Sequence, residues 1–235
     1  MSASPSPFAR LGAALRSFGG GLTGLVYPEL CLGCEGRLGD TDLPVCPTCL
    51  RGLPRAGDDI AGLLAGAPVR RAVALWTFDP RGTVRRVQHA LKYGGRPRLG
   101  APLGRLLGRA YTEAAGTRPD LVVPVPLARL RFLERGYNQA EGLAEGVADA
   151  IGAAVERDVL VRSRDTQRQA TLSKALRRQN VEGVFALAPG VEVAGWRVLL
   201  VDDVTTTGAT LAAAARPLAE AGATVDVAAL AIAGA

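Results

Sequence analysis

The stretch VLLVDDVTTTGATL, residues 198–211, constrains the fold more than any other part of this chain. An apolar run leads into two adjacent carboxylates, Asp202 and Asp203, and a threonine-rich turn follows, with Gly208 near its end. The alanine-rich sequence after Gly208 is typical of a helix. This order predicts a buried strand that ends at a polar turn, from which a helix begins.

The rest of the chain alternates the same two patterns. Residues 53–68 are typical of a linker, and residues 164–185 of a long polar excursion with a helical centre. We predict strands over 72–78, 120–127, 155–162, 196–203 and 224–233, and helices over 8–18, 83–93, 99–114, 134–152 and 210–222. Strands that alternate with helices predict an α/β fold, in which helices cover both faces of a mostly parallel sheet.

Composition excludes several classes of protein. A hydrophobic fraction of 48% and a charged fraction of 21% are those of a globular chain, not of a disordered or fibrous one. No run of 18 apolar residues is present, so we expect no membrane-spanning helix. The first 21 residues lack a basic segment followed by a continuous apolar one. Without this secretory signal, we expect a cytoplasmic protein.

The four cysteines form two C-x-x-C pairs, CLGC and CPTC, separated by eleven residues. In a cytosolic chain this spacing is typical of one tetrahedral zinc ion, and no cysteine is left over. A redox pair or two disulfides are the alternatives, which a reducing compartment disfavours. We expect structural zinc, with nucleic acid or a protein as a further partner of the module. The predicted metal ligands are Cys31, Cys34, Cys46 and Cys49.

Positive charge concentrates in two segments. Residues 81–109 hold eight arginines and lysines and no acid, and residues 157–178 hold seven basic residues against Asp158 and Asp165. Basic segments of this kind suit phosphate-rich ligands, small or polymeric. A solvated helix face in an arginine-rich protein is the alternative for any single arginine.

The turn after Asp203 has the chemistry of a site for a sugar phosphate. Backbone N–H groups at the start of the helix and the threonine hydroxyls favour a phosphate. The carboxylates repel phosphate and accept hydrogen bonds from hydroxyls instead. A ribose 5-phosphate, whose phosphate lies near a vicinal diol, meets both demands. A P-loop is the rival, but G-x-x-x-x-G-K-[ST] is absent; two exposed turn aspartates are the other alternative.

With these residues in view, the stretch closely resembles the motif of type I phosphoribosyltransferases that binds phosphoribosyl pyrophosphate (PRPP). The order of CxxC…CxxC, ALKYGG, VVPVPL, RGYNQA, RxTxxQ…RxxNVxGxF and VDDVTTTGAT resembles the ComF family over about residues 25–235. The resemblance implies a small zinc-ribbon module fused to a type I phosphoribosyltransferase domain. It also implies a role in DNA uptake by naturally competent bacteria.

The resemblance assigns the PRPP-binding residues by position. Asp202 and Asp203 match the acidic pair that binds the ribose 2'- and 3'-hydroxyls and serves catalysis. The loop for the 5-phosphate matches Thr205, Thr206, Thr207, Gly208, Ala209 and Thr210. Residues 126–131 match the pyrophosphate-binding loop.

Candidates for the pyrophosphate come from two places. Arg129 and Arg131 belong to the loop after the VVPVP strand. The excursion over residues 162–185 resembles the flexible loop that folds over PRPP, which implies pyrophosphate contacts for Lys174, Arg177 or Arg178. Lys92, in LKYGG, and residues 135–139, RGYNQ, are hallmarks of the family pattern, with packing or capping as the alternative to a role in the site.

If transfer occurs, an acceptor displaces pyrophosphate at ribose C1 through an oxocarbenium-like transition state. The acidic pair would stabilise the positive charge, and Mg2+ with the loop cations would stabilise the departing pyrophosphate. No general base is evident, since the single histidine, His89, lies in a basic helix where an exposed position is expected.

Three functions are compatible with these motifs. The first is an active phosphoribosyltransferase. Its acceptor is not assigned, because no segment of the sequence is identifiable as one that recognises a nucleobase. The second is a catalytically silent adaptor that senses PRPP or binds single-stranded DNA and DNA-uptake proteins. The third, weaker, is a zinc-ribbon nucleic-acid protein with a vestigial fold. The expected organisation is a lead segment (1–28), the cysteine module (29–55), a linker with the first part of the domain (56–118) and the transferase core (119–235).

Overall fold

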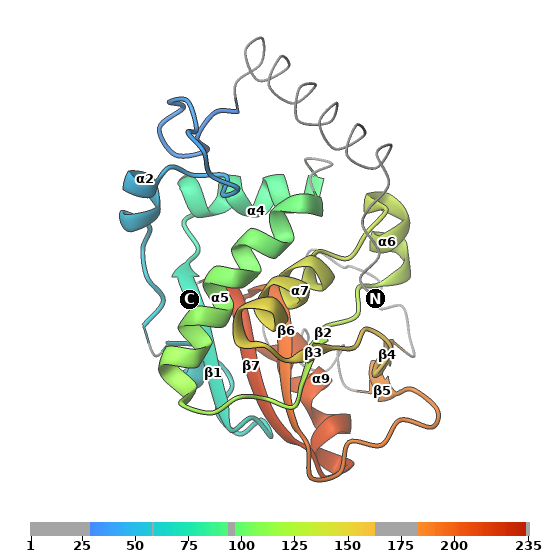
Figure 1. The fold of residues 1–235 in the computed structure, drawn as a ribbon. Coiled ribbons are helices and arrows are strands. Elements are labelled where there is room, and N and C mark those ends of the chain that lie inside the picture. Colours follow the sequence, from blue (N-terminus) through green and yellow to red (C-terminus); the bar gives the residue numbers. More distant parts are fainter. Residues whose placement is uncertain (1–28, 58, 94–96, 163–182, 234–235) are drawn as a thin grey trace, which may run out of the picture. The chain divides into compact units, whose positions relative to one another are not determined.

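The chain divides into two compact units, Met1–Arg51 and Gly52–Ala235. The computed structural model describes residues 29–57, 59–93, 97–162 and 183–233 (Figure 1). The predicted helix over 8–18 lies outside these residues. The division at Arg51 falls close to the predicted end of the cysteine module at residue 55.

The described part of the first unit has little core of its own. An isolated bridge between Leu30 and Arg37 closes its first cysteine turn, and its second leads into the helix α2 (Pro47–Arg51). Its buried side chains are those of Cys31, Pro44 and Val45. So few buried apolar groups do not stabilise a folded module alone, which is why such modules depend on metal ions or cross-links.

The second unit contains a parallel sheet of five strands, as predicted. The order across the sheet is β1-β7-β6-β2-β3, and every neighbouring pair is parallel. The strands are β1 (Arg71–Thr77), β2 (Leu121–Pro124), β3 (Ala154–Val155), β6 (Arg197–Thr205) and β7 (Thr224–Ile232). Continuous apolar runs such as LVVP and VLLV suit strands that are covered on both faces.

Helices cover both faces of the sheet (Figure 1). On one face, α5 (Gly100–Ala115) packs on β1 and β7, while α7 (Gln139–Ile151) packs on β2 and β6. On the other, α9 (Ala209–Glu220) packs on β6 and β7. The remaining elements are α3 (Asp59–Leu63), α4 (Thr83–Tyr93), η1 (Pro97–Leu99), α6 (Arg129–Arg135) and the antiparallel pair β4 (Leu160–Arg162) and β5 (Phe185–Leu187).

Three predicted elements differ in detail. The helix expected over 134–152 is two helices, α6 and α7, because Gly136 adopts a left-handed φ of 79° and ends α6. The strand expected over 155–162 is split between β3 and β4. The stretch 53–68 is more than a linker, since it contains α3 and buries Ile60 and Leu64 in the core.

The sheet has a topological switch point between β2 and β6, and in folds of this kind ligands bind in the crevice beyond such a point. The chain leaves β2 through α7 for β3 at one edge, and it leaves β6 through α9 for β7 on the other side. The two connections therefore diverge where β2 and β6 lie side by side. In an open α/β sheet, such a switch point at the carboxyl ends of the strands is where ligands bind.

A buried carboxylate ties β7 to its surroundings. Asp226 is 0% exposed, and its oxygens accept hydrogen bonds from Arg70 Nε at 2.9 Å and Tyr111 Oη at 2.7 Å. Burial, followed by the bond to Asp226, raises the pKa of Tyr111. Asp226 lies near the beginning of β7, whereas the crevice lies at the strand ends, so this network is structural.

Glycines let α5 and α7 pack closely. A Cβ added at Gly104 would lie 2.1 Å from the Leu143 carbonyl oxygen, which cannot move without its helix. We expect Gly104→Ala to lower the free energy of unfolding by about 1–3 kcal/mol, as overpacking does. Urea denaturation measures the effect. Gly62→Ala is the control because no atom lies within 4 Å of its added Cβ; an equal loss there would contradict this explanation.

Candidate functional site

The acidic pair lies near the end of β6, at the crevice. Asp202 is half-buried, and Asp203 is buried with 9% exposure. The backbone N–H of Asp203 donates to Asp202 Oδ1 at 2.8 Å, which fixes the first carboxyl group. The strand continues to Thr205, two residues beyond its predicted end at 203, so the pair lies within the strand, just before its end.

The turn after β6 leads directly into α9. Thr205 is 4% exposed, and its hydroxyl accepts the Gly208 N–H at 3.1 Å, so this side chain shapes the turn from within. Thr207 Oγ1 accepts the Ala209 N–H at 3.4 Å. Thr206 is exposed and Thr210 is half-buried. An exposed hydroxyl and the first N–H groups of a helix form the type of surface that binds phosphate.

Gly208 is required for two separate reasons. Its φ is 71°, in the left-handed region that side chains other than glycine rarely adopt. A Cβ at this position would also lie 2.7 Å from the Leu63 carbonyl oxygen. The chain around α3 therefore packs directly against the turn, which the pattern after Asp203 did not reveal.

The loop after β2 lies beside the acidic pair. Pro124 is in register with Val201, and the Val125 N–H donates to the Val201 carbonyl at 2.9 Å. The next residues lead into α6, where Arg129 is exposed and Arg131 is paired with Glu134 at 2.6 Å. The sheet thus places the residues just before the predicted segment 126–131 beside the strand that carries the acidic pair, although the two are far apart in the sequence.

Lys92 joins the acidic pair, although its motif predicted no definite role. Its Nζ atom lies 2.6 Å from Asp203 Oδ2. It comes from the last turn of α4, where a cation is also favoured by the helix dipole. The signal in the sequence was the LKYGG motif, and the contact could not be inferred because it joins residues 111 positions apart, 92 and 203.

The first carboxyl group of the pair is difficult to ionise. Burial, and then the neighbouring charge of Asp203, raise the pKa of Asp202 from an ordinary 3.8 to about 8. The Asp203 N–H bond and the charge of Lys92 act in the opposite direction. A ligand whose hydroxyls donate to this carboxylate would favour its charged form.

The raised pKa of Asp202 makes stability depend on pH. The protonated carboxyl group of Asp202 contributes to the free energy of unfolding. This contribution is fully present below the pKa of the group in the unfolded chain, near 3.8, and it is lost as pH rises through the folded-state pKa of about 8. We expect Asp202→Asn to be more stable than the wild type by about 1–2 kcal/mol above pH 8 and nearly equal below pH 4. Urea unfolding at both pH values tests this, with Asp149→Asn, whose side chain is 68% exposed, as the control. A constant difference at both pH values would contradict it.

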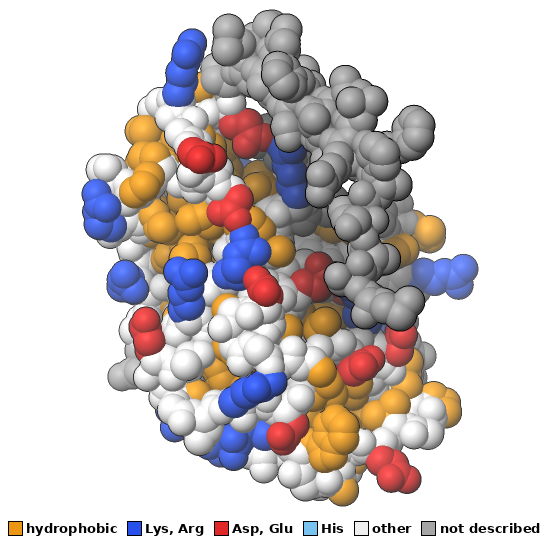
Figure 2. Space-filling model, viewed as in Figure 1, with side chains coloured by type: hydrophobic (Ala, Val, Ile, Leu, Met, Phe, Trp, Pro, Cys, Tyr) orange, Lys and Arg blue, Asp and Glu red, His pale blue; other side chains and the backbone are white. Residues whose placement is uncertain are grey.

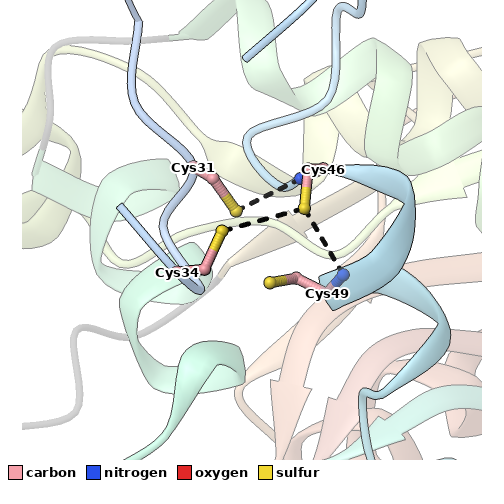
Figure 3. Close-up of side chains that lie close together, drawn as sticks. All are labelled: Cys31, Cys34, Cys46 and Cys49. Atoms are coloured by element: carbon pink, nitrogen blue, oxygen red, sulfur yellow. Dashed lines mark hydrogen bonds between the residues drawn. The ribbon is translucent and has the colours of Figure 1, made fainter. Parts of the chain in front are cut away.

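The four cysteines converge in the first unit (Figure 3). Their sulfur atoms all lie within 4.8 Å of one another, and Cys34 Sγ lies 3.9 Å from Cys46 Sγ. Tetrahedral zinc with Zn–S bonds of about 2.3 Å separates its sulfurs by about 3.8 Å. Gly33 permits this approach, since a Cβ there would lie 2.6 Å from Cys49 Sγ. The cluster therefore fits one metal ion.

The pKa values of these thiols differ because their hydrogen bonds differ. Cys31 Sγ accepts the N–H groups of Gly33 at 3.3 Å and Cys46 at 3.2 Å. Burial raises the pKa of the Cys31 thiol. Hydrogen bonds from backbone N–H groups, above all that of Cys46, outweigh this effect and lower the pKa to about 6. The thiol of Cys46, then burial, raise the pKa of Cys49 to about 12. Crowded thiols resist simultaneous ionisation unless a cation balances them.

Other predicted features have mixed outcomes. Lys174, Arg177 and Arg178 lie outside the described residues, between β4 and β5. His89 is exposed, as expected, and its ring lies 5.0 Å from that of Tyr93.

On the face shown in Figure 2, basic side chains stand singly with acidic ones among them, so this face has no continuous basic patch among the described residues.

Within the described ranges, no helix combines the length and apolar character of a membrane crossing.

Comparison with known proteins identifies the family to which the chain belongs. The phosphoribosyl transferase domain family matches residues 97–235. DNA utilization protein YhgH of Salmonella typhimurium is 32% identical over 223 residues, which cover 86% of this chain and 96% of that protein. Competence protein F of Haemophilus influenzae is 38% identical over 189 residues, 77% of this chain and 80% of that protein.

A shorter match is to competence protein ComFC of Streptococcus pneumoniae, 35% identical over 101 residues, which are 43% of this chain and 42% of that protein. The parallel sheet, its switch point and these matches define a protein of the phosphoribosyltransferase class. Within that class, the chain belongs to the ComF family, as its motifs had indicated.

Proposed function

We propose that this chain is a phosphoribosyltransferase that binds Mg-PRPP in the crevice between β2 and β6. One observation carries the proposal: the sheet places the acidic pair directly beside the loop after β2, through the register of Pro124 with Val201. The ribose diol would bind Asp202 and Asp203. Membership in the phosphoribosyltransferase class supports this proposal.

The other ends of the ligand fit the segments on either side of the diol. The 5-phosphate would bind the turn before α9, through the exposed Thr206 hydroxyl and the backbone N–H of Thr207. Pyrophosphate would extend toward residues 126–131, with Arg129 and Arg131 at the start of α6. Lys174, Arg177 and Arg178 are proposed to complete its binding.

The reaction would exchange one bond at ribose C1 for another. A lone pair on the acceptor forms the new bond to C1, while the bond from C1 to the pyrophosphate oxygen breaks and its electrons leave with pyrophosphate. The acceptor proton passes to solvent. The acidic pair faces the charge that develops on the ribose, and Mg2+ arrives as part of the substrate and balances the charge of pyrophosphate.

Pyrophosphate release tests this activity. The purified chain is incubated with Mg-PRPP and a pool of bases, amines and single-stranded DNA, beside the Asp202→Ala/Asp203→Ala variant. Release by the wild type alone supports a transferase, and fractionating the pool identifies the acceptor class. No release from a folded wild type that binds PRPP would overturn the enzymatic proposal.

A second candidate is an adaptor for DNA uptake that uses PRPP as a signal. The relatives named for competence and DNA utilization, together with the separate cysteine module, support it. This function implies PRPP binding without pyrophosphate release. It also implies an affinity for single-stranded DNA or uptake proteins, the former falling steeply with salt.

We further propose that the metal of the cysteine cluster is structural Zn2+. Four thiolates favour zinc, and four protein ligands leave no open position for chemistry. The zinc would hold the two cysteine turns together. The cysteines form no disulfides, in keeping with our proposal of a cytoplasmic protein.

A further inference from the structure

Lys92 and Asp203 form an ion pair that is largely withdrawn from solvent. Their side chains are 18% and 12% exposed, and Nζ lies 2.6 Å from Oδ2. The Oδ2 atom is inaccessible to solvent, and apart from this ion pair it accepts no hydrogen bond within the described part of the chain. Without Lys92, this oxygen would be a buried and uncompensated acceptor, which is costly.

Packing and one hydrogen bond fix the end of α4 from which Lys92 extends. Val84, Val87 and Leu91 are at most 1% exposed and anchor the helix in the core. The Tyr137 hydroxyl donates to the Leu91 carbonyl at 2.6 Å, at the residue just before Lys92. This bond satisfies one of the carbonyls that a helix leaves unpaired at its end.

The RGYNQ motif connects this helix end to the loop after β2. The Arg135 guanidinium lies 5.2 Å from the centre of the Tyr93 ring, a cation–π contact. Asn138 Nδ2 donates to the Val125 carbonyl at 3.1 Å, while Asn138 Oδ1 caps α7. The two motifs without an assigned role thus form one support, which runs from the loop after β2 to Lys92.

We propose that Lys92 is a positioning residue of the diol site, which holds the inner oxygen of Asp203 and leaves Oδ1 to a ribose hydroxyl. This inference rests on the proposed PRPP site. Lys92 does not compete with the ligand, because the oxygen that it binds is closed to solvent. Tyr137 acts one step further away, by fixing the helix end that carries Lys92.

The charges around the pair are few. The charged groups that shift the pKa of Asp202 are Asp203, on the same strand, and Lys92, from α4. On the neighbouring strands, Ala229 pairs with Asp202 and Ala231 with Val204, and β2 has already ended at Pro124. Removing Lys92 therefore removes the cation that opposes the rise in the pKa of Asp202.

The experiment compares Lys92→Met with Lys92→Arg, which keeps the charge. Arg105→Met is the matched control, because it breaks an ion pair, with Asp149 at 3.7 Å, that lies outside the crevice. The first measurement is calorimetric binding of Mg-PRPP from about pH 7 to about pH 10. We expect Lys92→Met to weaken binding about 10- to 100-fold at neutral pH, the effect of a charged hydrogen bond.

The shape of the pH profile separates positioning from a general structural defect. In Lys92→Met, the loss of affinity should shrink as pH rises, because the carboxyl group of Asp202 then ionises without the cation. Lys92→Arg should follow the wild-type profile, and Tyr137→Phe should show a smaller loss of the same shape. A loss that is equal at every pH, or a Lys92→Met variant that binds like the wild type, would overturn the proposal.

The second measurement needs no ligand and separates this proposal from the proposed function. Carbon-13 NMR follows the titration of the Asp202 carboxyl group, which has a pKa of about 8 in the wild type. We expect a higher pKa in Lys92→Met and no change in Lys92→Arg or Arg105→Met. An unchanged pKa in folded Lys92→Met overturns the role of Lys92, whereas a wild type that does not bind PRPP overturns the proposed function.

Discussion

Replacing both Asp202 and Asp203 by asparagine is expected to lower the affinity for Mg-PRPP by at least about 100-fold. Each hydrogen bond from a ribose hydroxyl to a charged acceptor contributes about 1.5–3 kcal/mol, and asparagine removes both charges. One local contact is kept, since the amide oxygen of residue 202 can still accept the N–H of residue 203, as Oδ1 of Asp202 does at 2.8 Å. Calorimetric titration of the two proteins measures the difference.

The matched control is Asp149→Asn on α7. Its carboxylate is 68% exposed and lies in a surface ion pair with Arg105, so its loss should leave the affinity unchanged. If the double variant is folded by circular dichroism and still binds Mg-PRPP within a few-fold of the wild type, the diol does not bind the acidic pair.

Removing the metal is expected to unfold the first unit and leave the second folded. The described part of the first unit buries the side chains of only three residues, Cys31, Pro44 and Val45, so thiolates bound to the proposed zinc would be its main support. We expect one zinc ion per chain by elemental analysis. After chelation, we expect proteolysis within residues 29–51 to become faster by orders of magnitude, with a stable fragment from residue 52 onward.

The control for chelation is a variant in which all four cysteines are serine. Its residues 29–51 should be cleaved rapidly with or without the chelator, because it has no thiolate to bind the metal. Protein that contains no metal as purified and still resists proteolysis in this segment would contradict a structural zinc site.

Sequence patterns predicted the parallel sheet and the turn between β6 and α9. Alternation of apolar strands and helices is a local signal, and α4 was predicted with its observed bounds, 83–93. The split of the helix over 134–152 was missed because Gly136 within a helical pattern is ambiguous, and only its φ of 79° shows that α6 ends there. The cysteine spacing likewise predicted a cluster, which the structure contains.

Contacts across the fold could not be predicted in the same way. The approach of Leu63 to Gly208 and the pair of Lys92 with Asp203 each join segments more than 100 residues apart. Only the tertiary structure sets such distances. Thr205 shows the same limit within one motif, since its hydroxyl accepts the Gly208 N–H inside the turn although the pattern grouped it with the threonines that face a phosphate.

We propose above all that Mg-PRPP binds in the crevice between β2 and β6. The most direct measurement is a titration of the nitrogen-15-labelled chain with Mg-PRPP, followed by amide NMR. We predict saturable shifts for the amides of Thr206, Thr207, Gly208 and Val125, with those of the cysteine module unchanged. Saturation without shifts at these positions, or no saturable shifts in the folded protein, would contradict this claim.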